Sequence, residues 1–561
     1  MLDVVARSHR GRICEYRTGD VSVRTPYVIS SDGGVRISHD GRARTLHVAD
    51  AEVPLDPKLL TTLSSYDNGG PASYGNVCVI RLPIPAELSV PDETEIVVVP
   101  NAFELRNNPR KLVDSVVRLR ESVGYGRAVC MLGIAEPSTL ALMTYMGVDM
   151  FDDSLARAAG VSQTTLIPEG EVRAEKDVSS DNASELDREC WKVRTFAEAG
   201  RLRELVDQRA PSSPRAVAAL RIFDRVGHAY QEEACPTAGD KFACNTTQAL
   251  RRPDLARYRE TLSERYSKPK HKRILLLLPC SARKPYHTSK THKAFASAIH
   301  TAQHDTLVHE VIVTSPLGAV PRELDVFYPA NSYDIPVTGE WKCEEKAMIG
   351  EMIAERVAEG YDRVICHLGE DAELVRGLAD MTETVVGDPT SPASLKNLDV
   401  ALREAAKGLA PVDDYTDRRE TVRSILAFQF GREAADAIMD DDTYATGKFP
   451  YWKIIREDPA DRKNKTQLGM LTPERGMISL TLEGAEVLAG RFNTVEMTDF
   501  EMKGNLFAVG VMKADQSLRI GDEAVVTLNR KVKAVGVAAM SGREMQDMRR
   551  GIAVRVRHKS K

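Results

Sequence analysis

The sequence has 561 residues, of which 42% are hydrophobic and 28% are charged, a composition typical of soluble globular proteins. No apolar run approaches the ~18 residues of a membrane span, and the N-terminus carries charges where a signal peptide would be apolar, so we expect a cytoplasmic protein that does not enter a membrane. A chain of this length exceeds what one hydrophobic core serves, and several domains are expected.

The predicted elements begin with an α/β pattern. A strand is predicted over 94–100 and a helix over 109–123, since Asn108 can cap the first turn of the helix and Gly124 follows its last turn. A further strand and helix are predicted within 127–147. This alternation favours a sheet of parallel strands.

A polar, acidic stretch over 163–189 interrupts the pattern, and we expect a surface loop or insertion there. Helices are predicted from Trp191 to about Ser267. A second α/β unit follows. Its strands are expected at 274–279, 309–316, 362–369 and 382–388, and its helices at 293–303 and 344–360.

The C-terminal third is predicted to contain two smaller pieces. Residues 415–487 mix both element types. From Arg491 onward the chain has short apolar runs separated by turns, a pattern typical of a small β-barrel.

Charge also sets the C-terminal piece apart. The net charge is −5, but from Glu501 to the C-terminus 13 lysines and arginines stand against 6 acidic residues, and the rest of the chain carries −12. A basic module on an acidic body is typical of proteins that bind phosphate-rich partners. The alternative is a solvated basic face without a ligand.

Nine cysteines are scattered along the chain without a C-x-x-C pair. Such a set indicates reduced thiols and gives no support for a four-thiolate zinc site. We therefore expect no bound metal and no cofactor.

A dense group of reactive side chains follows the strand predicted to end at Pro279. Within fourteen positions the chain places Cys280, Lys284, Tyr286, Ser289 and His292. Loops beyond the carboxyl ends of parallel strands build ligand crevices. A helix N-terminus and a nearby cation would lower the pKa of the thiol and activate it as a nucleophile.

The group also has structural interpretations. A cysteine after an apolar run is commonly a small buried hydrophobe. Lys284 and Lys290 are also compatible with solvated surface charges, and Ser289 or Thr291 with a helix cap. The residues alone leave these alternatives open.

The spacing P-C-x3-K-P-Y-x2-S-x2-H from Pro279 to His292 resembles the signature of the archaeosine synthase family, archaeal tRNA-modifying enzymes related to tRNA-guanine transglycosylases. Residues 314–341 are similar to the core domain of the same family. The resemblance implies a catalytic set, Cys280, Lys284, Tyr286, Ser289 and His292. It also implies a substrate-binding set, Pro279, Pro285, Ser315 and Asp152.

Residues 131–160 resemble the end of the transglycosylase barrel, in which Asp152 corresponds to the nucleophilic aspartate. About 150 residues precede it, too few for a full (β/α)8 barrel. The zinc-binding cysteine cluster of the transglycosylases is missing, and the stretch from Cys235 to Cys244 looks like its remnant. We therefore expect a truncated barrel in which Asp152 is a remnant and not a working nucleophile.

Residues 504–558 are similar to a PUA domain, a compact RNA-binding β-barrel, which would explain the basic surplus. The alternating Arg555 and Arg557 are expected on one strand face. The candidate ligands of RNA phosphates are Arg519, Lys531, Lys533, Arg549, Arg550, Arg555 and Arg557.

These interpretations predict a multidomain α/β protein with four parts. They are a truncated TIM-barrel-like, transglycosylase-related domain over 1–268, a catalytic core domain with a parallel sheet over 269–412, a small α/β linker domain over 413–487, and a PUA β-barrel that binds RNA over 488–561.

The resemblance implies a transferase that acts on tRNA carrying 7-cyano-7-deazaguanine at position 15 of the D-loop. An amine, either free lysine or nitrogen from glutamine, would add to the nitrile and give an amidine on the route to archaeosine. Cys280 would attack the nitrile to form a thioimidate. The alternative is direct attack by the amine, with the nitrile polarised by Lys284 and Tyr286.

Three further expectations concern partners and competing functions. The chain lacks a C-x-x-x-C-x-x-C cluster and a glutaminase-type motif, which favours lysine transfer with a radical-SAM partner that completes archaeosine. A homodimer is compatible with the sequence. The competing functions are a tRNA-guanine transglycosylase acting through Asp152 and a non-catalytic tRNA-binding subunit.

Overall fold

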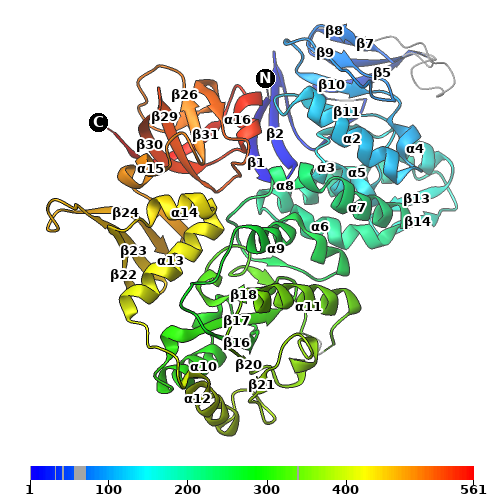
Figure 1. The fold of residues 1–561 in the computed structure, drawn as a ribbon. Helices are drawn as coiled ribbons and strands as arrows, with labels where there is room; N and C mark the ends of the chain where they lie inside the picture. Colours follow the sequence, from blue (N-terminus) through cyan, green and yellow to red (C-terminus); the bar gives the residue numbers. More distant parts are fainter. Residues whose placement is uncertain (1, 32, 41–42, 56–70, 338–339, 561) are drawn as a thin grey trace. The chain divides into compact units, whose positions relative to one another are not determined.

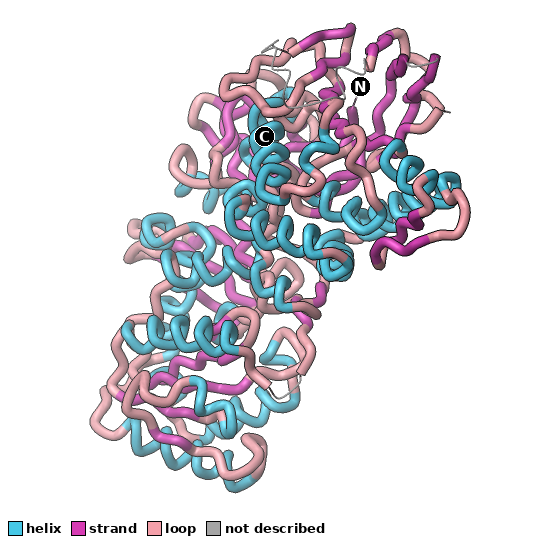
Figure 2. Tube along the Cα trace, turned by 90° about the vertical axis from the view of Figure 1, so that its right-hand side faces the viewer, coloured by secondary structure: helices cyan, strands magenta, loops and turns pink. Residues whose placement is uncertain are grey.

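The computed structural model describes residues 2–31, 33–40, 43–55, 71–337 and 340–560 (Figure 1). The chain divides into two compact units. Unit 1 comprises Met1–Cys235, Phe507–Val511 and Met540–Ala553, and unit 2 comprises Pro236–Leu506, Met512–Ala539 and Val554–Lys561. In the part of the chain that is described, no helix combines the length and apolarity that crossing a bilayer requires. Strands and helices are interleaved in both units (Figure 2).

Unit 1 begins with two three-stranded antiparallel sheets, neither of which was among the expected elements. The first consists of β1 (Leu2–Ser8), β2 (Gly11–Thr18) and β3 (Val21–Arg24). The second consists of β5 (Val35–Asp40), β6 (Ala43–Val48) and β7 (Ala51–Pro54).

The main sheet of unit 1 has the strand order β4-β12-β11-β10-β9-β8. Its strands are β4 (Tyr27–Ile29), β8 (Ala72–Tyr74), β9 (Val77–Val79), β10 (Ile96–Val99), β11 (Ala128–Met131) and β12 (Met150–Asp152). All neighbours are parallel except β8 and β9. The α/β prediction is confirmed. The barrel detail is not, because β4 and β8 are edge strands in the described sheet.

Helix α2 (Pro109–Val123) joins β10 to β11 with the boundaries that the sequence predicted. The Asn108 side chain accepts a hydrogen bond from the backbone N–H of Lys111 at 3.0 Å, which caps the first turn. Gly124, with φ of +72°, ends the helix in a conformation that favours glycine. Helix α3 (Pro137–Tyr145) joins β11 to β12.

The prediction of a surface loop over 163–189 is wrong. This stretch forms a hairpin of β13 (Thr164–Ile167) and β14 (Gly170–Arg173) and then enters helix α5 (Ser179–Glu198). The acidic residues concealed an apolar stripe at helical spacing, which is buried in the fold. The stripe consists of Leu186, Cys190, Val193 and Ala197.

The other helices that follow agree with the prediction from Trp191 to Ser267. They are α6 (Leu202–Arg209), α7 (Pro214–Val226) and α8 (His228–Glu233) in unit 1 and α9 (Pro253–Glu264) in unit 2. Helix α7 packs against α2 and α3 and so covers the helical layer of unit 1.

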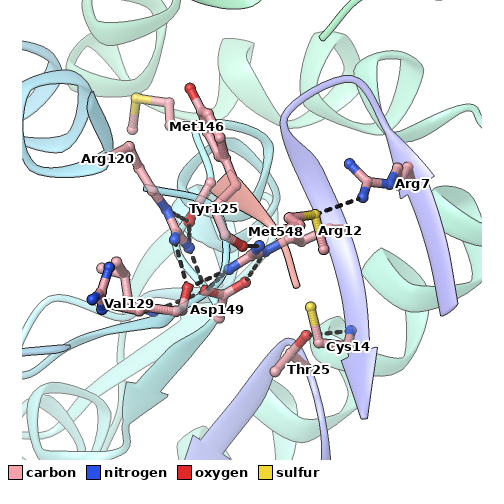
Figure 3. A network of polar contacts seen from close by, with 12 residues as sticks. Arg7, Arg12, Cys14, Thr25, Arg120, Tyr125, Val129, Met146, Asp149 and Met548 are labelled. Carbon is pink, nitrogen blue, oxygen red and sulfur yellow. Dashed lines mark hydrogen bonds and ion pairs between the residues drawn. The ribbon is translucent and has the colours of Figure 1, made fainter. Parts of the chain in front are cut away.

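A buried ionic network connects β2, α2 and the start of β12 (Figure 3). Arg12 donates to the two carboxylate oxygens of Asp149 at 2.9 and 3.0 Å, and Arg120 donates to one of them. The backbone N–H of Val129 adds a hydrogen bond at 2.8 Å. Desolvation raises the pKa of Asp149, but the two arginines and this N–H outweigh it, so the pKa lies below its usual range.

Unit 2 is built around a sheet in the order β18-β17-β16-β20-β21. Its strands are β16 (Ile274–Pro279), β17 (Val308–Thr314), β18 (Gly318–Pro321), β20 (Arg363–Cys366) and β21 (Thr382–Glu383). The strands predicted at 274–279, 309–316 and 362–369 are confirmed, but the strand predicted at 382–388 covers only two residues. The unpredicted β18 is antiparallel to β17.

Both faces of this sheet are buried, which explains the unbroken apolar run of β16. Ile274, Leu276 and Leu278 pack with α10 (Lys290–Thr301) and α12 (Pro392–Ala406). Leu275 and Leu277 belong to the larger core that includes α11 (Cys343–Ala358).

The remaining pieces of unit 2 are small. Helices α13 (Asp414–Phe430), α14 (Arg432–Ile438) and α15 (Leu482–Leu488) accompany an antiparallel sheet of β22 (Thr443–Lys448), β23 (Tyr451–Glu457), β24 (Lys465–Thr472) and β25 (Met477–Leu480). The C-terminal sheet contains β26 (Thr494–Met497), β29 (Glu523–Leu528), β30 (Lys531–Ala538) and β31 (Ile552–Lys559). The β-rich character predicted after Arg491 is confirmed.

Candidate functional site

The candidate site lies at the carboxyl edge of the parallel strands of unit 2. Three loops leave this edge, one after β16 that begins at Cys280, one after β17 that begins at Ser315, and one after β20 that leads into the 3-10 helix η7 (Gly369–Leu374). Strands that run parallel bring their carboxyl ends to one edge, and the loops there line the ligand crevice in α/β folds.

Cys280 is exposed, as expected for a residue offered to a substrate. Desolvation raises the pKa of its thiol, and the Lys284 ammonium and a hydrogen bond from Thr314 oppose this rise without reversing it. The net direction is opposite to that expected from the sequence. The physical reason is that the protein atoms around the sulfur remove more of the hydration energy of a thiolate than one cation and one hydroxyl restore.

The Lys284 side chain contacts the rings of two tyrosines. Its Nζ atom lies 4.0 Å from the ring centroid of Tyr333 and 5.7 Å from that of Tyr286. Desolvation lowers the pKa of Lys284, while the Cys280 thiolate and the Asp334 carboxylate oppose this. The pKa of the thiol is raised and that of the amine is lowered, so the two values lie on the sides that allow a proton to pass between the groups.

The Tyr286 side chain is fully buried, and its hydroxyl contacts the hydroxyl of Tyr333. It also donates to Thr314 Oγ1 at 3.3 Å. Sequence reasoning missed Thr314 and Tyr333. Thr314 is the last residue of β17, beside the strand that ends at Pro279, so the topology would have suggested it; Tyr333, in the two-residue strand β19 (Tyr333–Asp334), has no local signal.

Ser289 caps a helix, which is the structural alternative to the catalytic role expected from the sequence. Its hydroxyl accepts a hydrogen bond from the backbone N–H of His292 at 3.1 Å and caps the first turn of α10. The side chain is 3% exposed. The residue begins the helix that carries His292.

His292 is buried and neutral. Its Nδ1 accepts a hydrogen bond from Arg322 at 2.7 Å, since a guanidinium can only donate. Desolvation, with Arg322 as the second cause, lowers the pKa of His292 to about 3. An imidazole held in this form does not exchange protons near neutral pH, which opposes the proton-relay role expected from the sequence.

The residues expected to bind substrate lie in two places. Pro279 pairs with Val313 at the end of β16, and Pro285 opens the 3-10 turn η4 (Tyr286–Thr288). Ser315 is buried and donates to Glu345 Oε1 at 2.6 Å, so its hydroxyl faces the start of α11.

Asp152 belongs to unit 1, at the carboxyl end of β12. One carboxylate oxygen accepts from the backbone N–H of Gly133 at 2.5 Å, and the other is 3.2 Å from an amino nitrogen of Arg44. The side chain is 1% exposed. One oxygen thus contacts the loop after β11 and the other contacts Arg44 of β6.

The basic residues of the C-terminal sheet differ in availability. Lys531, Arg549, Arg550 and Arg555 are exposed, and Lys533 is half-buried. Arg550 lies 3.7 Å from Asp3, and Arg519 donates to the carbonyl of Gln516 at 2.8 Å. Among the exposed residues, Arg550 already shares its charge with Asp3, which reduces what it offers to a phosphate.

Arg557 does not share a face with Arg555 as predicted. It pairs with the fully buried Glu523 and donates to the carbonyl of Leu480 at 2.7 Å. The ladder between β30 and β31 shifts between Val535 and Gly536, and this bulge breaks the alternation that the spacing implied.

Three family models match parts of the chain. Residues 255–402 match a domain of unknown function, DUF5591, residues 420–493 match the patch-forming domain C2 of tRNA-guanine transglycosylase, and residues 495–559 match the PUA domain. The PUA prediction is confirmed, whereas the four domain boundaries expected from the sequence stay predictions.

Similar proteins extend over most of the chain. It is 32% identical to "Archaeosine synthase subunit alpha" of Methanosarcina acetivorans, over 84% of this chain and 80% of that protein. It is 30% identical to "Archaeosine synthase" of Haloferax volcanii, over 99% of both chains. It is 25% identical to the "tRNA-guanine(15) transglycosylase" of Methanothermobacter thermautotrophicus, over 80% of this chain and 68% of that protein.

Proposed function

The chain belongs to the archaeosine synthase family, and on that premise we propose that it is a transferase that modifies tRNA. The substrate is tRNA with 7-cyano-7-deazaguanine at position 15 of the D-loop, and the product carries an amidine in place of the nitrile. Support comes from the names of the relatives and from the match to the PUA domain.

The pairing of Cys280 with Lys284 carries the proposal. A thiol with a raised pKa beside an amine with a lowered pKa is a nucleophile with its base in place. Lys284 takes the thiol proton as the sulfur bonds to the nitrile carbon and delivers that proton to the nitrile nitrogen. The product of this step is a thioimidate.

The second step exchanges sulfur for nitrogen. An amine attacks the thioimidate carbon, the carbon–sulfur bond breaks, and the proton lost by the amine returns to the Cys280 sulfur. An amidine and a free thiol result, so the enzyme is restored. Direct attack on the nitrile without Cys280 is less well supported, because the Tyr286 hydroxyl that would polarise the nitrile is buried and bonded to Tyr333.

The amine is free lysine in our proposal, with glutamine as the alternative. The sequence has no C-x-x-x-C-x-x-C cluster, so a radical-SAM partner would complete archaeosine from a lysine adduct. The candidate acidic groups near the crevice are compatible with a cationic donor. Asp371 interacts with Cys280, and Asp334 interacts with Lys284.

Two other functions are less well supported. A transglycosylase acting through Asp152 would need a free carboxylate, whereas this one is buried and engaged by Gly133 and Arg44. A non-catalytic tRNA-binding subunit would not need an exposed cysteine residue beside a desolvated amine.

The test incubates the purified chain with nitrile-bearing tRNA and isotopically labelled lysine or glutamine, followed by mass spectrometry of the nucleosides. Addition of one labelled lysine supports the proposal, and loss of the reaction in Cys280→Ala supports the thioimidate. Cys343→Ser is the matched control, because Cys343 is the other exposed cysteine among the described residues. Base exchange in place of addition would support the transglycosylase, and no change with any donor would support the binding subunit.

A further inference from the structure

Three buried hydroxyls from three separate elements meet at the end of β17, and the pairing of Pro279 with Val313 places Thr314 next to Cys280. Thr314 ends β17, Tyr286 lies in the loop after β16, and Tyr333 belongs to β19. Thr314 Oγ1 is 2.5 Å from the Tyr333 hydroxyl, and the two tyrosine hydroxyls contact each other. None of the three side chains is more than 2% exposed, so water does not compete for these hydrogen bonds.

We infer that Thr314 and Tyr333 are positioning residues for the nucleophile, and that with Tyr286 they form a chain of hydroxyl donors directed at the Cys280 sulfur. This inference rests on the proposed function for its role in catalysis, but its physical content concerns only the state of the thiol.

The number of protons in the cluster determines the direction in which the hydrogen bonds between the three hydroxyls run. Each hydroxyl carries one proton and can therefore donate once. When Tyr333 donates to Tyr286 and Tyr286 donates to Thr314 Oγ1, the proton of Thr314 is free to point at the sulfur. Thr314 also has the carbonyl of Ser315 within 3.0 Å, so it has an acceptor when the thiol is protonated. A thiolate at Cys280 would compete with this carbonyl for the Thr314 proton.

The chain of hydroxyl donors offsets part of the desolvation cost that opposes ionisation of the Cys280 thiol. The charged groups that act on Cys280 are Lys284, which favours the thiolate, and Asp371, which opposes it. The hydrogen bond from Thr314 acts in the same direction as Lys284 and lowers the pKa of the thiol. Burial prevents both tyrosines from ionising, since it raises their pKa values well above the usual range, so they remain donors.

The experiment measures the rate at which iodoacetamide alkylates Cys280 in the full chain as a function of pH, with Cys343→Ser as the background so that one exposed thiol remains. Thr314→Val keeps the shape of the side chain but removes the donor. We expect the midpoint of its alkylation profile to rise by about one pH unit, which slows alkylation at pH 8 by about 10-fold. Thr314→Ser restores the donor and should restore the rate, and Tyr333→Phe should slow it about threefold.

Alkylation profiles of Thr314→Val and Thr314→Ser that coincide with the starting protein would overturn the inference. A thermal melt of each variant separates a lost hydrogen bond from a lost fold. Slow alkylation in Thr314→Val that Thr314→Ser fails to restore also counts against the chain of hydroxyl donors. Alkylation needs no tRNA. A shifted midpoint in a protein that fails to modify tRNA therefore supports the hydroxyl chain while it removes the proposed reaction.

Discussion

The Nζ atom of Lys284 lies 4.0 Å from the ring centroid of Tyr333, although one residue follows β16 and the other belongs to β19. The ring face attracts a cation, whereas desolvation favours the neutral amine. Because these two effects oppose each other, a small change in its surroundings alters the protonation of Lys284. This suits a group that must take a proton from Cys280 and release it.

Substitution of Lys284 separates its charge from its proton transfer. Lys284→Met removes the cation that lowers the pKa of the thiol, and we expect alkylation of Cys280 at pH 8 to slow by about 10-fold. Lys284→Arg keeps the charge but holds its proton, so alkylation should stay within about threefold of the starting rate while modification of tRNA is lost. Wild-type alkylation in Lys284→Met would show that the lysine does not act on the thiol.

His292 should make the protein sensitive to acid without taking part in the reaction. Its pKa is about 3 in the folded chain, against about 6.5 when unfolded, so between these values only the unfolded chain binds the proton. This contribution to stability is complete above about pH 7 and decreases as the pH falls, by about 2 kcal/mol between pH 8 and pH 5.

The measurement compares urea unfolding of the wild type and His292→Gln at pH 8 and pH 5. The variant should lose less stability on acidification, and its modification rate should stay within a few fold of the wild type. His300→Gln is the control, since this side chain is 86% exposed and its Nδ1 lies 3.4 Å from Asp305 Oδ2, a few residues beyond the end of α10. A His292→Gln variant that folds but is inactive would restore the proton-relay role.

Arg555 and Arg557 should give opposite results. Arg557→Ala leaves the buried Glu523 without its shortest ionic partner, and we expect a loss of about 3 kcal/mol in the free energy of unfolding. Arg555→Ala should leave stability unchanged and reduce the slope of log affinity for tRNA against log salt by about one. Equal salt slopes for wild type and Arg555→Ala would exclude this residue from the phosphate contacts.

Asp152→Asn tests whether the remnant carboxylate has a chemical role. The amide still accepts a hydrogen bond from Gly133 but loses the ion pair with Arg44, and we expect a loss of about 1–3 kcal/mol in stability. The rate of nitrile modification should not change once the variant is compared at a temperature where it is folded. A fall of 100-fold or more in that rate, at full folding, would assign Asp152 to the reaction.

Local patterns predicted the elements well where packing and propensity agree. The cap of α2 at Asn108, its end at Gly124 and the buried run of β16 all follow from short stretches of sequence. Charged residues dominate the stretch over 163–189 and predict a loop, whereas α5 is a helix because of its buried stripe, of which only Leu186 lies within that stretch.

The sequence by itself determined the family signature, the α/β alternation and the position of Cys280 at a strand end, because each depends on residues that are close along the chain. Tertiary structure alone decided what surrounds the thiol. Thr314 of β17 meets Tyr333 of β19 next to the end of β16, and the lowered pKa of His292 depends on desolvation by the surrounding fold and on Arg322, 30 residues further along the chain. Desolvation and hydrogen bonding act through space, so the pKa values that set the chemistry are fixed only when the fold brings these groups together.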